Sequence, residues 1–286
     1  MSIFEEISKK FCLPNAWNDW ENYRDSLTDL IIGYGRKTDS KTVSIIGAGR
    51  CNDVDLSRLT EHFEKIVLFD YDFDSMKEAI VSCGPEGRSR DRVEIRVSSL
   101  TGLKKEDLEN FFEKVMMRTR GLGSNLTFEK LETILSEEIE VLKLVITESM
   151  GNLHMVLPKT DIMVCNGVFS QLLSTISFFL RSVIASVPES FGTDGGSVVK
   201  KMEKKLHEIN NEMIPGIVSL VVGSSKKAAV FGNEYNKDRP VEGAFQCIDA
   251  IRRLGRKTED FTGVWDFNRA AGVRYEMLIQ TVYGKT

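Results

Sequence analysis

The sequence predicts an α/β fold built on a mostly parallel seven-stranded sheet with helices on both faces. The first observation is the alternation of apolar strand patterns with helical patterns between residues 42 and 97, which is typical of parallel βαβ units. The second is the region from residue 263 to 284, where two strand patterns are separated by the four residues Arg269 to Gly272. Because no helix fits between them, the last strand is expected to lie antiparallel in the sheet.

Helical patterns precede the alternating part, and an insertion interrupts it. Residues 2–11 and 15–35 space their apolar side chains at helical intervals, and Gly33 and Gly35 are expected to end the second helix. A crossover needs one helix, but residues 104–158 hold patterns for two, so we expect a helical insertion there. The remaining expected elements, in order, are strand 42–46, helix 55–63, strand 65–69, helix 74–83, strand 92–97, helices 104–119 and 126–149, strand 161–165, helix 168–187, a glycine-rich loop at 191–197, helix 197–213, strand 217–222 opened by Pro215 and Gly216, helix 241–255 and the final two strands.

These elements divide the chain into a small N-terminal part and one large domain. We expect residues 1–40 to be a helical cap, either a lid over the acceptor pocket or plain packing against the sheet, and residues 41–286 to be the main domain. The segment 168–187 is about long enough to cross a membrane. It carries Gln171 and Arg181, however, so we interpret it as a largely buried helix of a soluble domain.

Composition narrows the class of protein. The chain has 286 residues, of which 42% are hydrophobic, and a net charge of −4. A general nucleic-acid binder would be more basic, so no nucleic-acid partner is expected. The five cysteines are scattered without a CxxC pair, which indicates neither a disulfide framework nor a metal site. The first residues, MSIFEEISKKF, contain no apolar signal segment, so a cytoplasmic protein without membrane attachment is the expectation.

The stretch SIIGAGRCNDVDL at residues 44–56 carries the strongest functional signal. Gly47 and Gly49 follow the first strand, where glycine permits positive φ and lets a ligand approach the backbone. Asp70 ends the second strand, 70 − 49 = 21 residues after the second glycine, and its carboxylate can accept hydrogen bonds from both ribose hydroxyls. The alternative is a purely structural turn with a solvated Asp70. Together the glycines and Asp70 predict a cofactor that contains adenosine.

The residues after the glycines discriminate between adenosine cofactors. A dinucleotide fold prefers a third glycine where this chain has Asn52, and its phosphates would lie close to Asp53 and Asp55. S-adenosylmethionine has no phosphate and carries a sulfonium and an ammonium group. The two acidic residues would attract such a ligand, and S-adenosylmethionine is therefore the expected cofactor, with S-adenosylhomocysteine as its product.

At these residues the sequence resembles a known family. GAGRCNDVDL followed by KIVLFDYD is similar to motif I and the acidic end of strand two in class I S-adenosylmethionine-dependent methyltransferases, which are Rossmann-like enzymes. It looks most like a bacterial subgroup that writes the loop as GxGxCNDxxL. The resemblance extends through VSSLTGL, VCNGVFSQL, Pro215-Gly216 and the final hairpin, and so covers about residues 42–286. The chain departs from the family pattern at Cys51, at Ile45 and at Ser98 and Ser99.

The resemblance implies cofactor-binding roles for a set of residues. Those expected at the methionine end of the cofactor are Gly47, Ala48, Gly49 and Asp53, with Asp55 as the alternative to Asp53. Those expected around the ribose and adenine are Asp70, Tyr71, Ser99 and Leu100. Those expected beneath the sulfonium, on the side that opens toward the acceptor, are Asn166, Gly167, Val168 and Gln171.

The acceptor is predicted from the scarcity of candidate bases. A carboxylate is already ionised and needs no base, whereas a hydroxyl does. His154 is the one credible base, because His62 and His207 lie in charged helical surroundings. Arg269 and Arg274 flank the hairpin turn and could bind an acidic acceptor, as could Arg181 on the helix at 168–187.

We therefore expect O-methylation of a carboxylate on a small molecule or peptide, such as the C-terminus of a bacterial peptide natural product. A hydroxyl or amino acceptor is the alternative within the same class. A nicotinamide-dependent oxidoreductase and a nucleotide-binding protein without catalysis are the alternatives from other classes. The sequence leaves the oligomeric state open between monomer and homodimer.

Overall fold

The protein is described here by a computed structural model, which covers residues 3–10, 12–82, 84, 87–187, 195–236 and 241–284. Its strands are β1 (Thr42–Ile46), β2 (Lys65–Asp70), β3 (Val93–Val97), β4 (Ile162–Asn166), β5 (Ala228–Glu234), β6 (Thr258–Asn268) and β7 (Val273–Tyr283). Its helices are α1 (Ile3–Lys10), α2 (Ala16–Asp19), α3 (Glu21–Lys37), α4 (Leu56–His62), α5 (Phe73–Ser82), α6 (Lys105–Leu122), α7 (Phe128–Met150), α8 (Leu153–Val156), α9 (Ser174–Ala185), α10 (Gly195–Ser224) and α11 (Ala244–Arg253).

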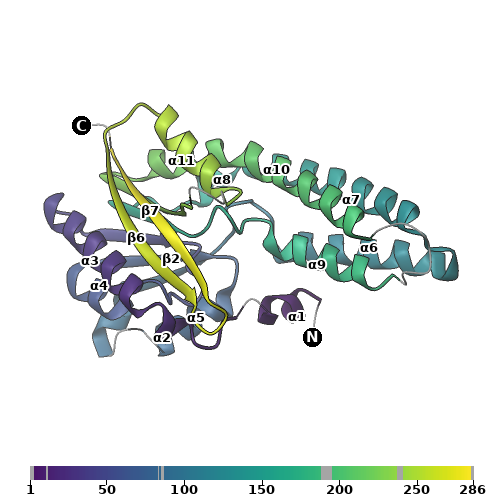
Figure 1. Ribbon diagram of the computed structural model, residues 1–286. Coiled ribbons are helices and arrows are strands. Elements are labelled where there is room, and N and C mark those ends of the chain that lie inside the picture. Colours follow the sequence, from purple (N-terminus) through teal and green to yellow (C-terminus); the bar gives the residue numbers. More distant parts are fainter. Residues whose placement is uncertain are drawn as a thin grey trace.

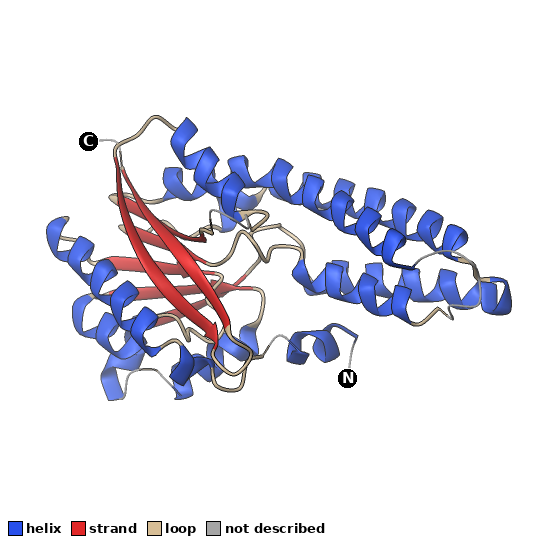
Figure 2. Ribbon diagram, in the orientation of Figure 1, coloured by secondary structure: helices blue, strands red, loops and turns tan. Residues whose placement is uncertain are grey.

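The strands form one seven-stranded sheet in the order β3-β2-β1-β4-β5-β7-β6 (Figures 1 and 2). Neighbouring strands from β3 to β5 are parallel, whereas β7 runs antiparallel to both β5 and β6. The α/β class, the mostly parallel sheet and the antiparallel C-terminal strand are thus confirmed. Chain order reverses between the neighbouring strands β1 and β4, which is the place where open α/β sheets bind ligands.

Helices cover both faces because successive side chains of a buried strand point in opposite directions. On one face, Ile45 of β1 belongs to a core cluster with Leu27 of α3 and Leu59 of α4. On the other face, the adjacent Ile46 belongs to a second cluster that includes Val218 of α10 and Ile251 of α11. The central strands are therefore apolar on both sides and hold the edge of the sheet rigidly.

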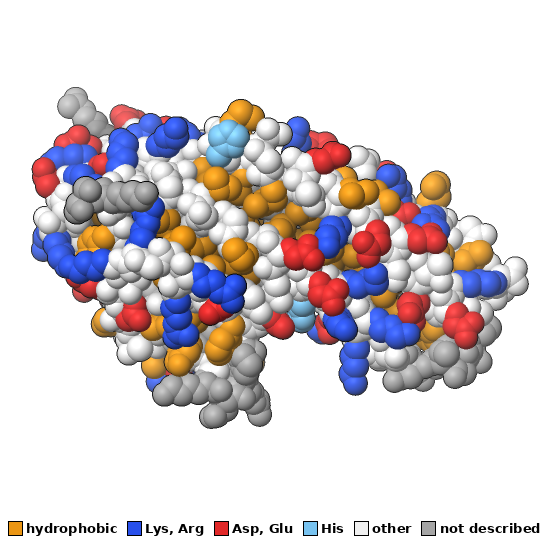
Figure 3. Space-filling model, turned by 90° about the horizontal axis from the view of Figure 1, so that it is seen from above, with side chains coloured by type: hydrophobic (Ala, Val, Ile, Leu, Met, Phe, Trp, Pro, Cys, Tyr) orange, Lys and Arg blue, Asp and Glu red, His pale blue; other side chains and the backbone are white. Residues whose placement is uncertain are grey.

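Long helices project beyond the carboxyl edge of the sheet. Helices α6, α7, α9 and α10 lie side by side and extend away from the strands, and α1 lies beside α9 (Figures 1 and 2). The segment 104–158 supplies α6, α7 and α8, which is more helix than one crossover between β3 and β4 needs. Lysines and glutamates pair between α7 and α10, and positive and negative side chains alternate over this projection in Figure 3. Such exposed pairs contribute about 0.2–1 kcal/mol each, so the apolar interface dominates the packing.

The fifth strand lies elsewhere than expected. Residues 217–222 are helical and belong to α10, which is 30 residues long and continues through Pro215. The buried side chains Ile214, Ile217, Val218 and Val221 have spacings of three and four residues, which places them on one helix face. The true fifth strand is β5, formed by AAVFGNE at 228–234. The Pro-Gly pair was the misleading signal.

Smaller differences concern helix ends. Helix α3 runs past Gly33 and Gly35 to Lys37, and the absence of a side chain at Gly35 lets the Phe63 ring pack closely against the helix. Helix α9 begins at Ser174, so the first part of 168–187 is a turn. Most of the expected loop 191–197 lies outside the described residues. Within the described ranges, no helix is both long and apolar enough for a membrane span.

Candidate functional site

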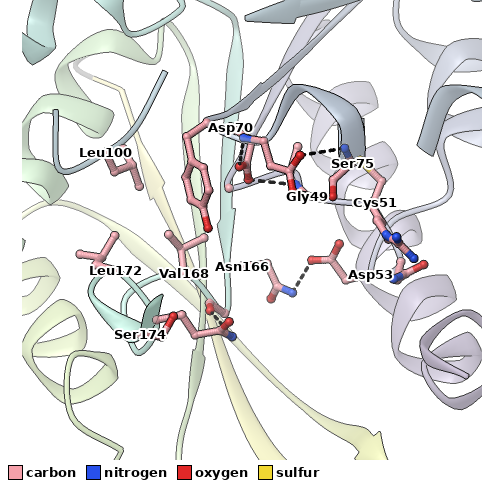
Figure 4. A pocket seen from close by; sticks show the side chains of 18 of the residues that line it. Gly49, Cys51, Asp53, Asp70, Ser75, Leu100, Asn166, Val168, Leu172 and Ser174 are labelled. Atoms are coloured by element: carbon pink, nitrogen blue, oxygen red, sulfur yellow. Dashed lines mark hydrogen bonds between the residues drawn. The ribbon is translucent and has the colours of Figure 1, made fainter. Parts of the chain in front are cut away.

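A cavity of about 300 Å³ lies at the carboxyl edge of the sheet, beside the junction of β1 and β4 (Figure 4). The structure brings every residue of the expected cofactor set to its wall. These residues are Gly47, Ala48, Gly49, Asp53, Asp70, Tyr71, Ser99, Leu100, Asn166, Gly167, Val168 and Gln171. The wall therefore joins the loop after β1, the end of β2, the loop after β3 and the loop after β4.

The loop after β1 depends on glycine at two places. Gly47 has φ +70° and Gly49 has φ +47°, a region that side chains rarely adopt. A Cβ on Gly47 would stand 2.7 Å from Cγ2 of Val168, so the loops after β1 and β4 meet without space for a side chain. Cys51 also has a positive φ, of 51°, which is uncommon for a residue other than glycine. The motif that this loop resembles often has glycine at this position. The turn thus allows a ligand in the cavity to come close to the backbone of this loop.

Asp70 closes the turn from the neighbouring strand. Its Oδ2 accepts a hydrogen bond from the Gly49 N–H at 3.0 Å, and its Oδ1 accepts one from the Asp72 N–H at 2.9 Å. Burial raises the pKa of the Asp70 carboxyl, and these backbone donors act in the opposite direction. Each carboxylate oxygen retains a lone pair for another donor, so Asp70 can accept from a ligand's hydroxyl groups.

A polar network occupies the end of the pocket between β1 and β4. Tyr23 Oη donates to Asn166 Oδ1 at 2.6 Å, and Asn166 Nδ2 donates to Asp53 Oδ2 at 2.7 Å. Burial raises the pKa of Asp53. Asp55 has a different role, because it caps α4 by accepting from the Arg58 N–H and does not line the pocket. Of the two acidic candidates, the structure places Asp53 at the cavity.

The loop after β3 borders the opposite end. Ser99 Oγ lies 2.8 Å from Thr101 Oγ1 and accepts from the Thr101 N–H, so this hydroxyl mainly holds its own loop. Leu100 is buried beside it, and the Tyr71 side chain is 40% exposed. On the β4 loop, Gln171 Nε2 donates to the Gly167 carbonyl at 3.1 Å. Leu100 and Tyr71 thus add an apolar and an aromatic side chain to a wall that is otherwise polar at this end.

Aromatic residues that sequence reasoning did not assign to the pocket form another wall. Trp20, Trp265 and Phe267 line the cavity. Trp20 packs edge-on against Trp265 at 4.8 Å between ring centroids and stacks on Phe267 at 5.5 Å. Trp20 Nε1 donates to the Phe267 carbonyl at 2.8 Å, across 247 positions of sequence. No local pattern connects such distant residues, although a lid formed by residues 1–40 was one of the two expectations for the N-terminal part.

The expected catalytic candidates do not meet at this cavity. His154 is exposed on α8, with Nδ1 3.0 Å from the Gly151 carbonyl. Arg269 and Arg274 are partly exposed, and their Nε atoms lie 3.7 and 3.4 Å from the carboxylate of Asp266. None of the three lines the pocket, and Arg181 borders a separate cavity between α9 and α10. Among the described lining residues, Arg50 is the only Lys or Arg, and there is no histidine.

The chain matches no protein-family model and no curated protein. Its fold is similar to solved methyltransferase structures. The N-methyltransferase NodS from Bradyrhizobium japonicum, in complex with S-adenosylhomocysteine, is 9% identical, with 99% of this chain and 98% of that chain covered and a TM-score of 0.46. Magnesium protoporphyrin IX methyltransferase from Synechocystis, with bound S-adenosylmethionine, is 10% identical, with coverages of 99% and 89% and a TM-score of 0.44. Precorrin-6y C5,15-methyltransferase from Geobacter metallireducens is 9% identical, with coverages of 91% and 88% and a TM-score of 0.41. At these identities the likeness extends to the fold alone.

Proposed function

We propose that the protein is an S-adenosylmethionine-dependent methyltransferase that acts on a small molecule or peptide. The observation that carries the proposal is the pairing of the Gly47–Gly49 turn with Asp70. The turn has positive φ, presents bare backbone to the cavity, and donates its Gly49 N–H to the carboxylate that would hold the ribose. In this proposal, Ser99 and Leu100 flank the adenine, and Asn166 to Val168 lie beneath the sulfonium.

Charge favours S-adenosylmethionine over a dinucleotide. Among its described lining residues, the pocket carries Asp53, Asp70 and Asp72 against one cation, Arg50, whose Nη2 already lies 2.9 Å from a carboxylate oxygen of Glu78. Two phosphates in this pocket would be repelled, whereas a sulfonium and an ammonium would be attracted. The same charges argue against a nicotinamide-dependent oxidoreductase. Asp53 is the residue that we assign to the cofactor's ammonium group.

The N-terminal residues are assigned a covering role. Cys12, Leu13, Ala16 and Trp20 line the cavity and follow α1 along the chain. We propose that residues 1–40 cap the pocket and exclude water from the transferred methyl group, whose sulfonium would otherwise be solvated. The carboxylate acceptor expected from the sequence stays a prediction. The prediction is supported by the lack of a histidine among the described lining residues. Against it, the arginines that were expected to bind the acid do not line the cavity.

Calorimetric titration with S-adenosylmethionine, S-adenosylhomocysteine and NADH tests the cofactor assignment. We expect both adenosyl ligands to bind at about micromolar Kd, near −8 kcal/mol, and NADH to show no binding. The variant Gly47→Val should lose this binding with its circular dichroism unchanged, because the added side chain would meet Val168. Gly33→Ala is the matched control, since nothing lies within 4 Å of a Cβ there. Equal binding by Gly47→Val would mean that the turn is only structural.

A further inference from the structure

A second and larger hollow adjoins the proposed cofactor cavity. It has a volume of about 1060 Å³ and lies between α1, the start of α5, the loop after β3 and α8. The two cavities share part of their walls, because several described residues line both, among them Tyr71, Asp72, Ser98 and Ser99. The cofactor cavity therefore opens into the hollow along this shared rim.

The opening lies at the adenine end of the proposed cofactor site. Ser99 is assigned to the adenine, and Tyr71 follows Asp70, which is assigned to the ribose. The residues assigned to the sulfonium, 166–168, line the cofactor cavity but not the hollow. In adenine, the ring edge that carries the N6 amine lies opposite the nitrogen that is bonded to the ribose. The N6 edge is therefore the part of the bound cofactor that faces the hollow.

The loop after β3 holds no carboxylate that could fix the N6 amine. Its residues 97–103 read VSSLTGL, without Asp or Glu. The hydroxyl of Ser99 is engaged within the loop, since its Oγ lies 2.8 Å from Thr101 Oγ1 and accepts from the Thr101 N–H at 3.1 Å. An N6 amine with one alkyl group keeps one N–H as a donor, so such a group does not remove the hydrogen-bonding capacity of this position.

Exposed apolar side chains gather around the hollow. Phe73, which follows Asp72 of the rim, is 47% exposed, and Val97, which precedes Ser98 of the rim, is 58% exposed. Exposed apolar groups that cluster in this way mark a binding surface more often than isolated ones do. Among the described residues, eleven large apolar side chains are exposed, and five of them line the hollow, namely Tyr71, Phe73, Val97, Met155 and Val156.

Charge and volume favour a neutral apolar occupant. The described lining of the hollow contains five acidic and four basic residues, so its charge is nearly balanced. Two of the pairs are close, because Lys105 Nζ lies 2.9 Å from Glu5 Oε1 and Arg50 Nη2 lies 2.9 Å from Glu78 Oε2. A cavity of about 150 Å³ is enough to hold a benzene ring, so the hollow has ample space for one.

Resting on the proposed methyltransferase function, we infer that the hollow binds an apolar substituent on N6 of the cofactor's adenine. The protein then accepts N6-alkyl and N6-arylmethyl forms of S-adenosylmethionine and S-adenosylhomocysteine. The substituent lies against Phe73 and Val97 beside the rim, and the ribose and the methionine end keep their own contacts. Burial of the added group against these side chains makes its contribution to binding favourable.

Calorimetric titration of the protein with S-adenosylhomocysteine and with N6-benzyl-S-adenosylhomocysteine tests this inference. We expect the Kd of the benzyl form to be about tenfold lower, which corresponds to about 1.4 kcal/mol. An equal or higher Kd for the benzyl form overturns the inference, because it would mean that the N6 edge does not open onto an apolar surface. Absence of binding by both ligands would instead overturn the proposed function itself.

A double variant, Phe73→Ser with Val97→Ser, locates the substituent. Both positions are exposed, so we expect the fold and the Kd of S-adenosylhomocysteine to be retained and the tighter binding of the benzyl form to be lost. The matched control is Val141→Ser with Leu144→Ser on α7, where both side chains are exposed and line neither cavity. This control should keep the tenfold difference. An unchanged difference in the Phe73 and Val97 double variant overturns the inference.

Discussion

Asp70 performs two tasks with a single carboxylate. It holds the Gly49 N–H and the Asp72 N–H, and in the proposed complex it also accepts the ribose hydroxyls. The charge is useful for both, since hydrogen bonds to an ionised acceptor contribute about twice as much as neutral ones. Because the same carboxylate bonds the glycine turn and the ribose, the conformation of the turn should depend on whether the cofactor is bound.

Replacing Asp70 by Ala is expected to weaken S-adenosylmethionine binding by about 1–3 kcal/mol, because the ribose hydroxyls lose a charged acceptor. The affinity of Asp70→Asn for S-adenosylmethionine should lie between that of Asp70→Ala and that of the wild type, because the amide oxygen accepts a hydrogen bond without carrying a charge. Calorimetry measures both variants, and Asp249→Ala on α11, which pairs with exposed Arg253, is the matched control. Unchanged affinity in Asp70→Ala would remove this residue from the cofactor site.

The predicted cofactor residues that line the cavity share one property: each belongs to a short motif that lies at or just after a strand end. Gly47 and Asp70 follow β1 and end β2, so their proximity follows from parallel pairing alone. Tyr23, Trp265 and Glu234 come from three elements whose packing no local pattern specifies. They become neighbours only when the hairpin packs against α3, which is why these contacts escaped prediction and the glycine turn did not.

At the scale of elements, α10 is the clearest case of a local signal overruled by packing. Proline lacks the N–H that would bond the carbonyl of residue 211, which normally ends a helix. The helix continues because the apolar side chains on both sides of Pro215 face the same core, from Met213 and Ile214 to Val221 and Val222. Burying each of them contributes about 1.5–3 kcal/mol, which together outweighs one proline.

This account predicts that Pro215→Ala stabilises the protein. Removing a proline from a helix interior is expected to gain about 1–3 kcal/mol in free energy of unfolding, measured by urea denaturation. Gly216→Ala provides a second variant in the same turn, because nothing lies within 4 Å of its Cβ and helical Gly-to-Ala changes gain about 0.5–1 kcal/mol. If residues 217–222 were a strand opened by a Pro-Gly turn, both changes would destabilise the fold instead.

At the scale of the whole molecule, three buried carboxyls gather near one cavity. Burial raises the pKa of Asp53, Asp70 and Glu234 above the ordinary values near 4. Hydrogen bonds to lysines lower the pKa of surface carboxylates such as Glu94, Glu140 and Glu259. These groups therefore take up protons only below the ordinary pKa of a carboxyl. Burial therefore favours the uncharged form of these three carboxyls in the ligand-free protein, and a cationic ligand beside them would favour the charged form.

These shifts predict how stability changes with pH. A carboxyl whose pKa is raised by folding takes up its proton in the folded state first, so its contribution to stability grows as pH falls through the raised value and is lost as pH rises. As the pH is lowered from neutral toward about 4, the ordinary carboxyl value, the Tm of the ligand-free protein should rise relative to that of the double variant Asp53→Asn, Glu234→Gln. Differential scanning calorimetry of both proteins across this range checks the sign. A parallel pH dependence of the two Tm values would show that the shifts are absent.

The overall architecture was more predictable than its parts. Alternating patterns before residue 97 fix β1, β2 and β3 as a parallel set, and the four-residue turn at 269–272 fixes the antiparallel end. The prediction of the fifth strand was wrong because the chain has two apolar runs in this region, 217–222 and 228–234, and only the second is a strand. Periodicity over six or seven residues cannot separate a buried strand from a buried helix segment.

The strand order also sets a sequence of events during synthesis. Strand β7 is made after every other strand, yet it lies between β5 and β6 in the finished sheet. Until the ribosome has passed residue 283, the whole edge of β5 has no partner and β6 has nothing to pair with. An exposed apolar strand edge invites pairing with other chains. A nascent chain stalled between β5 and β7 is thus the form of this protein most in need of a chaperone.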